Sequence, residues 1–344
     1  MLPRDVPLTP RAALADVIRG QARVVGSRTE AGRDAFGLPP GVVSPYELRA
    51  AAGLAYGDPA IEEARYEQRR TRLKDLATLA RFAVTAPLAR AAAPRADVAV
   101  RPRVSLLGVE MDALDTAEAA TRIVRFAQAG VARRVFFVHP HALDLASRDA
   151  ELRAILCSGD LVLPDGAGIR LAARLSGTAL PANVNGTDLT PELLVELAVE
   201  RIPVALVGGA PGVAARAAAR WATRYGVTIA ATQDGFADAA TYDAWIASLP
   251  RPCVVLVGFG TPLQERFVER HLRDRAGIVA VTVGGLFDFA TDDKPRAPMA
   301  MRELGLEWLF RLAVEPRRLA SRYLVGGPRF LGRVLAERLR GRGL

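Results

Sequence analysis

Cysteine is nearly absent from this sequence, and its scarcity excludes two classes of stabilised fold. Cys157 and Cys253 are the only two cysteines among 344 residues, too few for a disulfide framework or a zinc cluster. Both lie inside apolar runs, and free cysteine is among the most buried residue types, so we expect both side chains to be buried. This usage fits a reducing compartment.

Long apolar runs are missing as well. None approaches the roughly 20 residues that a helix needs to cross a bilayer. Residues 1–10 are too polar for the apolar part of a secretory signal. We therefore expect a cytoplasmic chain whose contact with the inner face of the cell membrane is peripheral.

Lysine is scarce too, since Lys74 and Lys294 are the two lysines among 46 basic residues. The chain nevertheless has a net charge of +9. Residues 296–344 contain 11 arginines and 4 glutamates, so this end holds +7 of that charge. Such a segment favours phosphates, nucleic acid or an anionic membrane surface as partners. No nucleic-acid-binding motif accompanies the charge, so we expect no nucleic acid partner.

The chain changes character near residue 100. Residues 1–100 contain scattered prolines and a charged helical stretch, and they end in the Ala/Pro/Arg linker "APLARAAAPRADVAVRPR". Beyond it, short apolar runs alternate with Ala- and Leu-rich helical stretches. The pattern predicts an α/β fold, a Rossmann-like and mostly parallel sheet with helices on both faces. The expected buried strands are "RVFFVHP", "DLVLPDG", "PVALVGG", "TIAATQDG", "CVVLVGFG" and "GIVAVTVGG".

Polar residues and glycines follow these strands at the end where ligands bind in such sheets. Glycine allows the backbone to approach phosphate or sugar closely, and the amides at a helix start favour an anion. Four strand ends carry candidates. They are His139 and His141; Asp165 before Gly166 and Gly168; Gly258 and Gly260 before Gln264 and Glu265; and Gly284 and Gly285 before Asp288.

Other interpretations of these residues stay open from the sequence alone. The stretch "VGGAPGV" departs from the G-x-G-x-x-G spacing of a nicotinamide site. His139 and His141 are candidate metal ligands, but alternation along a strand would point them to opposite faces, and His271 lies on a polar helix. Asp165 followed by glycine is also a common turn pair. No Ser or Cys occupies a nucleophile elbow.

From about residue 104 to 330 the sequence resembles the WecG/TagA/CpsF glycosyltransferase family. Eight segments carry the resemblance in the order of the family: "VLPDGAGIRLAARL", "VNGTDL", "VALVGGAPGVAARAA", "QDGF", "VLVGFGTPLQERF", "VGGLFDF", "KPRAP" and "RELGLEWLFRLAVEPRRLASRYLVGGPRFL". The resemblance implies a Rossmann-like domain over 101–300 and a basic helical appendage over 301–344. It also implies an inverting, metal-independent and cofactor-free transfer from a UDP-sugar to an undecaprenyl-diphosphate-linked sugar. The expected sugar is of N-acetylmannosamine type, a uronate or a hexose, used for exopolysaccharide or another surface glycan.

The resemblance assigns the catalytic residues. Asp165 matches the proposed general base, which would take the proton of the acceptor hydroxyl. His139 and His141 stand where the family usually has Thr and Asn, so this chain departs from the pattern beside the base. Imidazoles can still hydrogen-bond a sugar or share a proton, and we include both histidines among the catalytic candidates.

The resemblance also suggests which residues bind each substrate. The donor-binding candidates are Gly208, Gly209, Gly258, Gly260, Gln264, Glu265, Gly284, Gly285 and Asp288. The acceptor-binding candidates are Asn185, Thr187, Asp188, Arg311, Arg317, Arg318 and Arg322. Two plainer alternatives stay open, in which Glu265 and Arg266 are an ordinary helix N-terminal pair and Thr187 or Asp188 is a helix cap.

The C-terminal end combines arginines with apolar residues at helical spacing, namely Phe330, Leu331, Val334, Leu335 and Leu339. Such a helix can lie in a lipid interface while its arginines meet headgroups or a lipid diphosphate. The alternative is a basic helix that packs on the domain for stability.

The first hundred residues resemble the tail of bacterial initiating sugar-phosphate transferases, through "PPGVVSPYELR", Tyr66 and "LKDLATLARF". The catalytic acid pair and membrane-dipping helix of those enzymes have no counterpart, so we interpret the segment as non-catalytic, a docking module or a spacer. Two other functions stay open, a nucleotide-sugar epimerase or dehydrogenase, and a weak or inactive membrane-docking partner of another glycosyltransferase. Assembly into a homo-oligomer is also left open.

Overall fold

The computed structural model describes residues 103–341 apart from 179, 182–183, 292–294, 296, 299–300 and 303–305. Nearer the N-terminus it describes 23–26, 41–44 and separate positions between 63 and 80. The chain divides into two compact units. One contains 1–93 and 298–307, and the other contains 94–297 and 308–344.

In the first unit, β1 (Arg23–Val25) pairs in parallel with β2 (Gly41–Val43). The hydroxyl of Tyr66 lies 3.1 Å from a carboxylate oxygen of Asp75 and 3.0 Å from the hydroxyl of Thr78. Most of "PPGVVSPYELR" and much of "LKDLATLARF" lie outside the described residues. The likeness to a sugar-phosphate transferase tail therefore stays a prediction.

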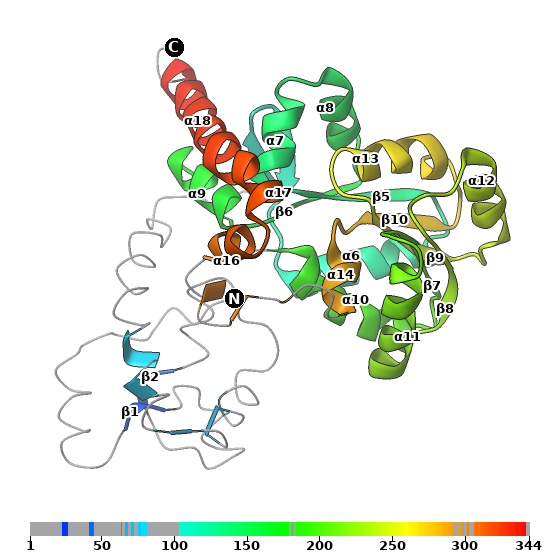
Figure 1. Ribbon diagram of the computed structural model, residues 1–344, viewed down its shortest axis with the longest axis horizontal. Helices are drawn as coiled ribbons and strands as arrows, with labels where there is room; N and C mark the ends of the chain where they lie inside the picture. Colours follow the sequence, from blue (N-terminus) through cyan, green and yellow to red (C-terminus); the bar gives the residue numbers. More distant parts are fainter. Residues whose placement is uncertain are drawn as a thin grey trace. The chain divides into compact units, whose positions relative to one another are not determined.

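The second unit is built on a sheet of six parallel strands in the order β6-β5-β10-β9-β7-β8 (Figure 1). The strands are β5 (Arg133–Val138), β6 (Leu161–Pro164), β7 (Val204–Gly208), β8 (Ile229–Gln233), β9 (Cys253–Gly258) and β10 (Ile278–Thr282). The six runs expected from the sequence are these six strands. Five are buried along their length or nearly so, whereas β8 is a half-buried edge strand, so the expectation of a buried strand there was wrong.

Helices cover both faces of the sheet because successive strand residues point to opposite sides. In β5, Val135 and Phe137 belong to one apolar cluster and Phe136 and Val138 to the other. The first cluster includes helices α6 (Thr116–Gln128), α10 (Gly186–Val199), α11 (Val213–Tyr225) and α14 (Leu286–Ala290). The second includes α7 (Pro140–Ala146), α8 (Ala150–Cys157), α9 (Ala167–Leu175) and α12 (Ala239–Ser248), with α13 (Leu263–Phe267) and the π-helical turn η1 (Val268–Leu272) after it. Figure 1 shows the two layers. The predicted α/β fold with a Rossmann-like sheet is confirmed.

A small hairpin, β3 (Arg103–Leu106) with β4 (Val109–Asp112), packs beside β6. Asp112 is buried, and its Oδ2 accepts a hydrogen bond of 3.0 Å from the backbone N–H of Val162. The exposed Cys157 lies at the end of α8, where its Sγ is 3.4 Å from the carbonyl oxygen of Gly108. Burial of both cysteines was therefore wrong for Cys157 and is confirmed for Cys253.

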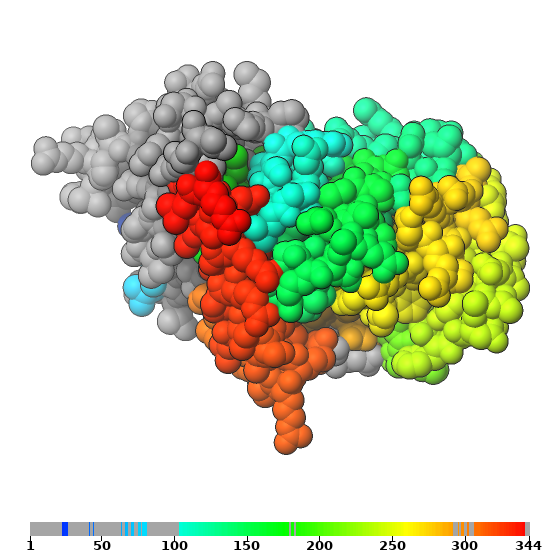
Figure 2. Space-filling view, turned by 90° about the horizontal axis from the view of Figure 1, so that it is seen from above, coloured from blue at the N-terminus to red at the C-terminus, as the bar shows by residue number. Residues whose placement is uncertain are grey.

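The C-terminal part of this unit is helical, with α16 (Glu307–Val314), α17 (Pro316–Ala320), the π-helical turn η2 (Ser321–Gly326) and α18 (Gly327–Gly341). In α18, Phe330 and Val334 are 1% and 0% exposed and belong to the same apolar cluster as α7 and α9. Leu335 and Leu339 are exposed. Figure 2 shows this helix, in red, lying against the green and cyan surface of the unit. Part of the apolar face therefore packs on the domain, as in the second alternative, and contact of the exposed leucines with lipid stays a prediction.

In the part of the chain that the structure describes, no helix is both long and apolar enough to cross a membrane.

Candidate active site

The candidate site lies at the carboxyl ends of the neighbouring strands β5 and β6. Val138 and Pro164 are register partners, and the backbone N–H of Asp165 donates to the carbonyl oxygen of Val138 at 2.8 Å. His139 follows β5 and Asp165 follows β6, so the two residues leave the sheet side by side. Gly166, with φ of 93°, turns the chain into α9, and a side chain there would meet nothing within 4 Å.

His139 begins α7 rather than ending a strand. Its Nδ1 accepts a hydrogen bond of 3.0 Å from the backbone N–H of Ala142, which makes it the N-cap of the helix. Its Nε2 lies 3.4 Å from the hydroxyl oxygen of Thr261. Burial lowers the pKa of His139 well below its usual range, and the charges of Arg322, His141 and Arg311 lower it further. His139 is therefore neutral at neutral pH, and both ring nitrogens have partners.

His141 lies in the first turn of α7, and its ring is nearly parallel to that of His139, with the ring centroids 6.0 Å apart at 9°. The two side chains do not point to opposite faces of a strand, so that expectation was wrong. Its ring makes no hydrogen bond to a described residue. Burial and then Arg322 lower the pKa of His141, against the opposing charge of Asp144. A neutral imidazole with free nitrogens thus stands beside Asp165's strand end.

Glu265 and Gln264 lie inside the protein at the start of α13. Oε1 of Glu265 accepts hydrogen bonds from the Thr261 hydroxyl and from Nε2 of Gln264, both at 2.9 Å. Oε1 of Gln264 accepts from the backbone N–H of Gly284 at 2.9 Å. Glu265 is 0% exposed, and burial raises its pKa while those hydrogen bonds oppose the shift. Glu265 lies in the first turn of α13 with its side chain buried, while Arg266 of the same helix forms an ion pair with Asp149 at 2.7 Å.

The glycines at the strand ends fall into two groups. At Gly208 a Cβ would lie 2.4 Å from the carbonyl oxygen of Gly258, and at Gly258 it would lie 2.7 Å from the ring of Phe287. Close packing of β7, β9 and α14 accounts for these two. Gly260 and Gly284 have φ of 76° and 59° and nothing within 4 Å of a Cβ, so their backbones border open space.

The remaining donor candidates lie near these glycines. Gly209, with φ of 71°, donates its N–H to the carbonyl oxygen of Gly258 at 3.1 Å. Gly285 is exposed and precedes α14, and Asp288 is half-buried in the first turn of that helix. A Cβ at Gly285 would lie 3.8 Å from Oδ2 of Asp288.

Asn185 and Asp188 form a reciprocal cap at the start of α10. Oδ1 of Asn185 accepts from the backbone N–H of Asp188 at 2.9 Å, and Nδ2 of Asn185 donates to Oδ2 of Asp188 at 2.7 Å. Both are buried, and Thr187 between them is half-buried. The helix-cap alternative therefore describes Asn185, with Asp188 as its partner.

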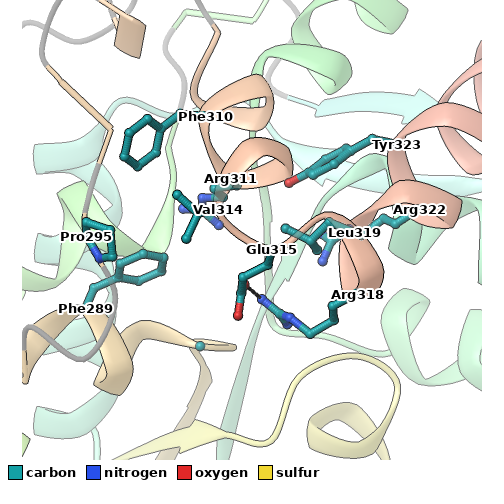
Figure 3. Close-up of a pocket in the computed structure, with 11 residues that line it drawn as sticks. Phe289, Pro295, Phe310, Arg311, Val314, Glu315, Arg318, Leu319, Arg322 and Tyr323 are labelled. Carbon is teal, nitrogen blue, oxygen red and sulfur yellow. Dashed lines mark hydrogen bonds and ion pairs between the residues drawn. The ribbon is translucent and has the colours of Figure 1, made fainter.

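A cavity of about 90 Å³ lies between the C-terminal helices and α14 (Figure 3). By the volume that one water needs, it has room for several waters. Arg311, Arg318 and Arg322 all line it. Arg311 lies over the ring of Phe289, 4.8 Å from the centroid, and Arg318 forms an ion pair with Glu315. Arg317 is exposed and is not among the lining residues.

Arg322 connects this cavity to the strand ends. Burial lowers its pKa, whereas the charges of Tyr323 and Asp165 raise it. The same arginine lowers the pKa of His139 and His141. A half-buried cation thus interacts electrostatically with all three candidate catalytic residues.

Two residues of the site were missed from the sequence. Thr261 lies in the segment "VLVGFGTPLQERF", four residues before Glu265, and this spacing of one helical turn was the signal for their contact. Asp144 has one local partner, Arg148, a helical turn away, but its contacts with Arg329 and Arg333 from the far end of the chain could not be read from the sequence.

Among the residues that the structure describes, no three His, Cys, Asp or Glu side chains form a group able to hold a metal ion. Independence from a metal stays a prediction.

The fold is a Rossmann-like α/β domain with an arginine-lined cavity beside α14, and comparison with known families gives its class. The model described as "Glycosyl transferase WecG/TagA/CpsF family" matches residues 104–343. The chain belongs to this family and is a glycosyltransferase, as the resemblance implied. It is similar to the N-acetylglucosaminyldiphosphoundecaprenol N-acetyl-beta-D-mannosaminyltransferase of Bacillus subtilis (strain 168), with 32% identity over 184 residues, 53% of this chain and 71% of that protein.

Proposed function

We propose that this glycosyltransferase moves an N-acetylmannosamine-type sugar from a UDP-sugar to a sugar linked to undecaprenyl diphosphate. The name of the Bacillus relative gives this donor sugar type and this class of acceptor. A β-linked product made from an α-linked nucleotide sugar requires inversion at the anomeric carbon. The reaction uses no metal and no cofactor, and its product enters an exopolysaccharide or another surface glycan.

Asp165 acts as the general base. The acceptor hydroxyl oxygen forms a bond to the anomeric carbon while its proton passes to the Asp165 carboxylate, and the bond from that carbon to the UDP oxygen breaks with both electrons leaving on UDP. The observation that carries the proposal is the adjacency of Asp165 and His139 at paired strand ends, together with the influence of Arg322 on both.

The two histidines take different parts in this proposal. His139 has both nitrogens engaged by Ala142 and Thr261, so it shapes the wall of the site. His141 has free nitrogens and hydrogen-bonds the acceptor sugar beside Asp165.

Arginines of the C-terminal helices bind diphosphate. Guanidinium groups pair with phosphate in a bidentate way, and Arg311 and Arg322 line a cavity of suitable size. Arg318 is engaged by Glu315, and Arg317 faces outward, so they contribute less directly. The open backbones at Gly260 and Gly284 lie along the donor, with Gly285 and Asp288 beside them.

The C-terminal helices also dock on the inner face of the membrane, where the lipid-linked acceptor resides. Trp308 and Leu309 of α16 and Leu324 and Val325 of η2 are 40%, 43%, 60% and 53% exposed. The rings of Trp308 and Tyr323 lie 5.8 Å apart, so the two segments are neighbours. Apolar side chains next to arginines suit an anionic lipid surface.

The Asp165→Asn variant tests the proposed function. It keeps the size of the side chain and the backbone hydrogen bond to Val138, so the circular dichroism spectrum and melting temperature should match the wild type. We expect transfer from UDP-N-acetylmannosamine to a lipid-diphosphate-linked N-acetylglucosamine to fall at least about 100-fold, the contribution of a general base. Turnover within a few-fold of the wild type would contradict the proposal.

A further inference from the structure

A chain of hydrogen bonds crosses the ends of three neighbouring strands. It runs from His139, after β5, to Thr261, after β9, at 3.4 Å. From Thr261 it passes to Glu265 at 2.9 Å, and from Glu265 to Gln264 at 2.9 Å. It ends at the backbone N–H of Gly284, after β10, at 2.9 Å. The carboxylate of Glu265 therefore lies in the middle of a hydrogen-bonded chain that joins His139 to Gly284.

The chemistry of the partners gives this chain a direction. Nδ1 of His139 accepts the N–H of Ala142, so the proton of the neutral ring is on Nε2. The Thr261 hydroxyl donates its hydrogen to Glu265, so its lone pairs are left to accept from His139. If residue 265 could only donate, the Thr261 hydroxyl would have to accept from it and donate to Nε2 of His139. The ring proton would then move to Nδ1, where it would prevent the cap to the N–H of Ala142.

The burial of Glu265 reduces the stability of the folded protein. It is fully buried, and its Oε2 has no hydrogen-bond partner among the described residues. A buried polar oxygen without a partner destabilises the fold. Packing alone would be better served by an apolar side chain of similar volume, which points to a role in the site.

We propose that Glu265 is a positioning residue, which holds His139 as the Nε2–H form through Thr261 and holds the backbone at Gly284 through Gln264. It touches neither substrate. The proposal rests on the proposed function in one respect, that His139 and Gly284 border the place of transfer. One consequence is that His139 has no lone pair for a substrate proton, which leaves that task to Asp165.

The groups around His139 support this form. His141 lies in its own helix, Arg311 and Arg322 come from the C-terminal helices, and all three lower its pKa together with burial. Thr261, with Glu265 behind it, faces Nε2. Asp165 leaves the sheet at the neighbouring strand end, and burial together with the positive charges keeps the ring of His139 neutral.

Nitrogen NMR of the histidine rings tests the proposal without turnover. The chain has three histidines, so ¹⁵N-histidine spectra of the full-length protein can be assigned with His141→Gln and His271→Gln. We expect His139 of the wild type to show a protonated Nε2 and an unprotonated Nδ1. Thr261→Val and Glu265→Met should each shift His139 toward a mixture of forms. Thr261→Ser and Glu265→Gln, which keep a hydroxyl and an accepting oxygen, should leave it unchanged.

Kinetics supply the second readout. We expect kcat/KM to fall about 10-fold in Thr261→Val and in Glu265→Met, the scale of a misplaced site. The double variant should lose no more than either single one, since both break one chain. Thr261→Ser and Glu265→Gln should each lose less kcat/KM than the valine and methionine variants at the same positions.

Two results would overturn the proposal. One is an unaltered His139 spectrum in folded Thr261→Val, which also serves if Glu265→Met does not fold. The other is a Glu265→Gln variant as impaired as Glu265→Met. Failure of the proposed function gives a different result. An active Asp165→Asn variant would show that Asp165 is not the base, whereas the expected changes at His139 in the Thr261 and Glu265 variants would still support the positioning role.

Discussion

Arg333 of α18 lies 3.2 Å from Oδ1 of Asp144 in α7, a carboxylate whose side chain is 2% exposed. Arg329 lies 3.8 Å from the other oxygen, and Arg148 lies 2.5 Å from it. Since α7 begins at His139, the helix that presents the two histidines is tied through Asp144 to the C-terminal helix. The basic end of the chain is thus part of the structure that supports the site.

Asp144→Asn should weaken this tie. Hydrogen bonds to charged groups contribute more than neutral ones, so we expect the free energy of unfolding to fall by about 2 kcal/mol. Amide hydrogen exchange in α18 should accelerate. Asp274→Asn, at a side chain that is 92% exposed, is the matched control and should change neither. Equal urea midpoints for the two variants would contradict the prediction.

Arg322 and Arg317 offer a matched pair for the diphosphate-binding role. Arg322 is half-buried, interacts electrostatically with Asp165 and lines the cavity, whereas Arg317 is exposed outside it. Arg322→Gln should lower kcat about 100-fold, the scale of removing one donor to a developing negative charge. Arg317→Gln should stay within about 3-fold of the wild type. Steady-state kinetics measures both, and a larger loss at Arg317 would count against the assignment.

Glu192 of α10 predicts a pH effect on stability. Burial, then Asp115, Glu196 and Asp188, raise its pKa to about 7. A raised carboxyl pKa means that the folded state holds a proton that the unfolded state has lost, so stability declines as pH rises from the unfolded value through 7. Glu192→Gln removes that loss.

We therefore expect Glu192→Gln to raise the melting temperature at pH 8 and to leave it nearly unchanged near pH 4.5, where the carboxyl is protonated in the folded state and half-protonated in the unfolded one. Scanning calorimetry at the two pH values is the measurement. A gain of the same size at both would show that packing, rather than ionisation, is responsible.

The exposed apolar residues of η2 predict membrane binding. Replacing Leu324 and Val325 together by Ser should weaken binding to phosphatidylglycerol vesicles at least about 10-fold, since a buried aliphatic side chain contributes on the order of 1.5 kcal/mol. Phe236→Ser, at a side chain that is 78% exposed in the loop after β8, is the control and should bind normally. Sedimentation with vesicles measures both, and equal binding by all three proteins would argue against docking through η2.

Much of the fold followed from short-range patterns. Each run of apolar residues became a strand because a strand covered on both faces has no polar side. The edge position of β8 did not follow, because sheet order depends on contacts between strands rather than on residues within one. Cys157 likewise lies in an apolar run but at the exposed end of α8, where helix rotation places it outward.

The site divides in the same way. Asp165 and the glycines after the strands were identified because a parallel sheet collects its strand ends at one edge. The placement of His139 and His141 was missed, since Pro140 starts a helix there and changes the period of the side chains from two to 3.6. The partners of Glu265 were missed because no local pattern indicates that a glutamate in a first helical turn points inward.

The sequence by itself determined the class of fold, the position of the Asp165 carboxylate at the carboxyl end of a strand, and the concentration of arginine near the C-terminus. Local composition and periodicity suffice for these. Tertiary structure decided which groups meet: Thr261 and His139 are 122 residues apart, and Arg333 and Asp144 are 189 apart. Only the closing of the chain brings such groups within reach, and the protonation of a buried side chain depends on what surrounds it there.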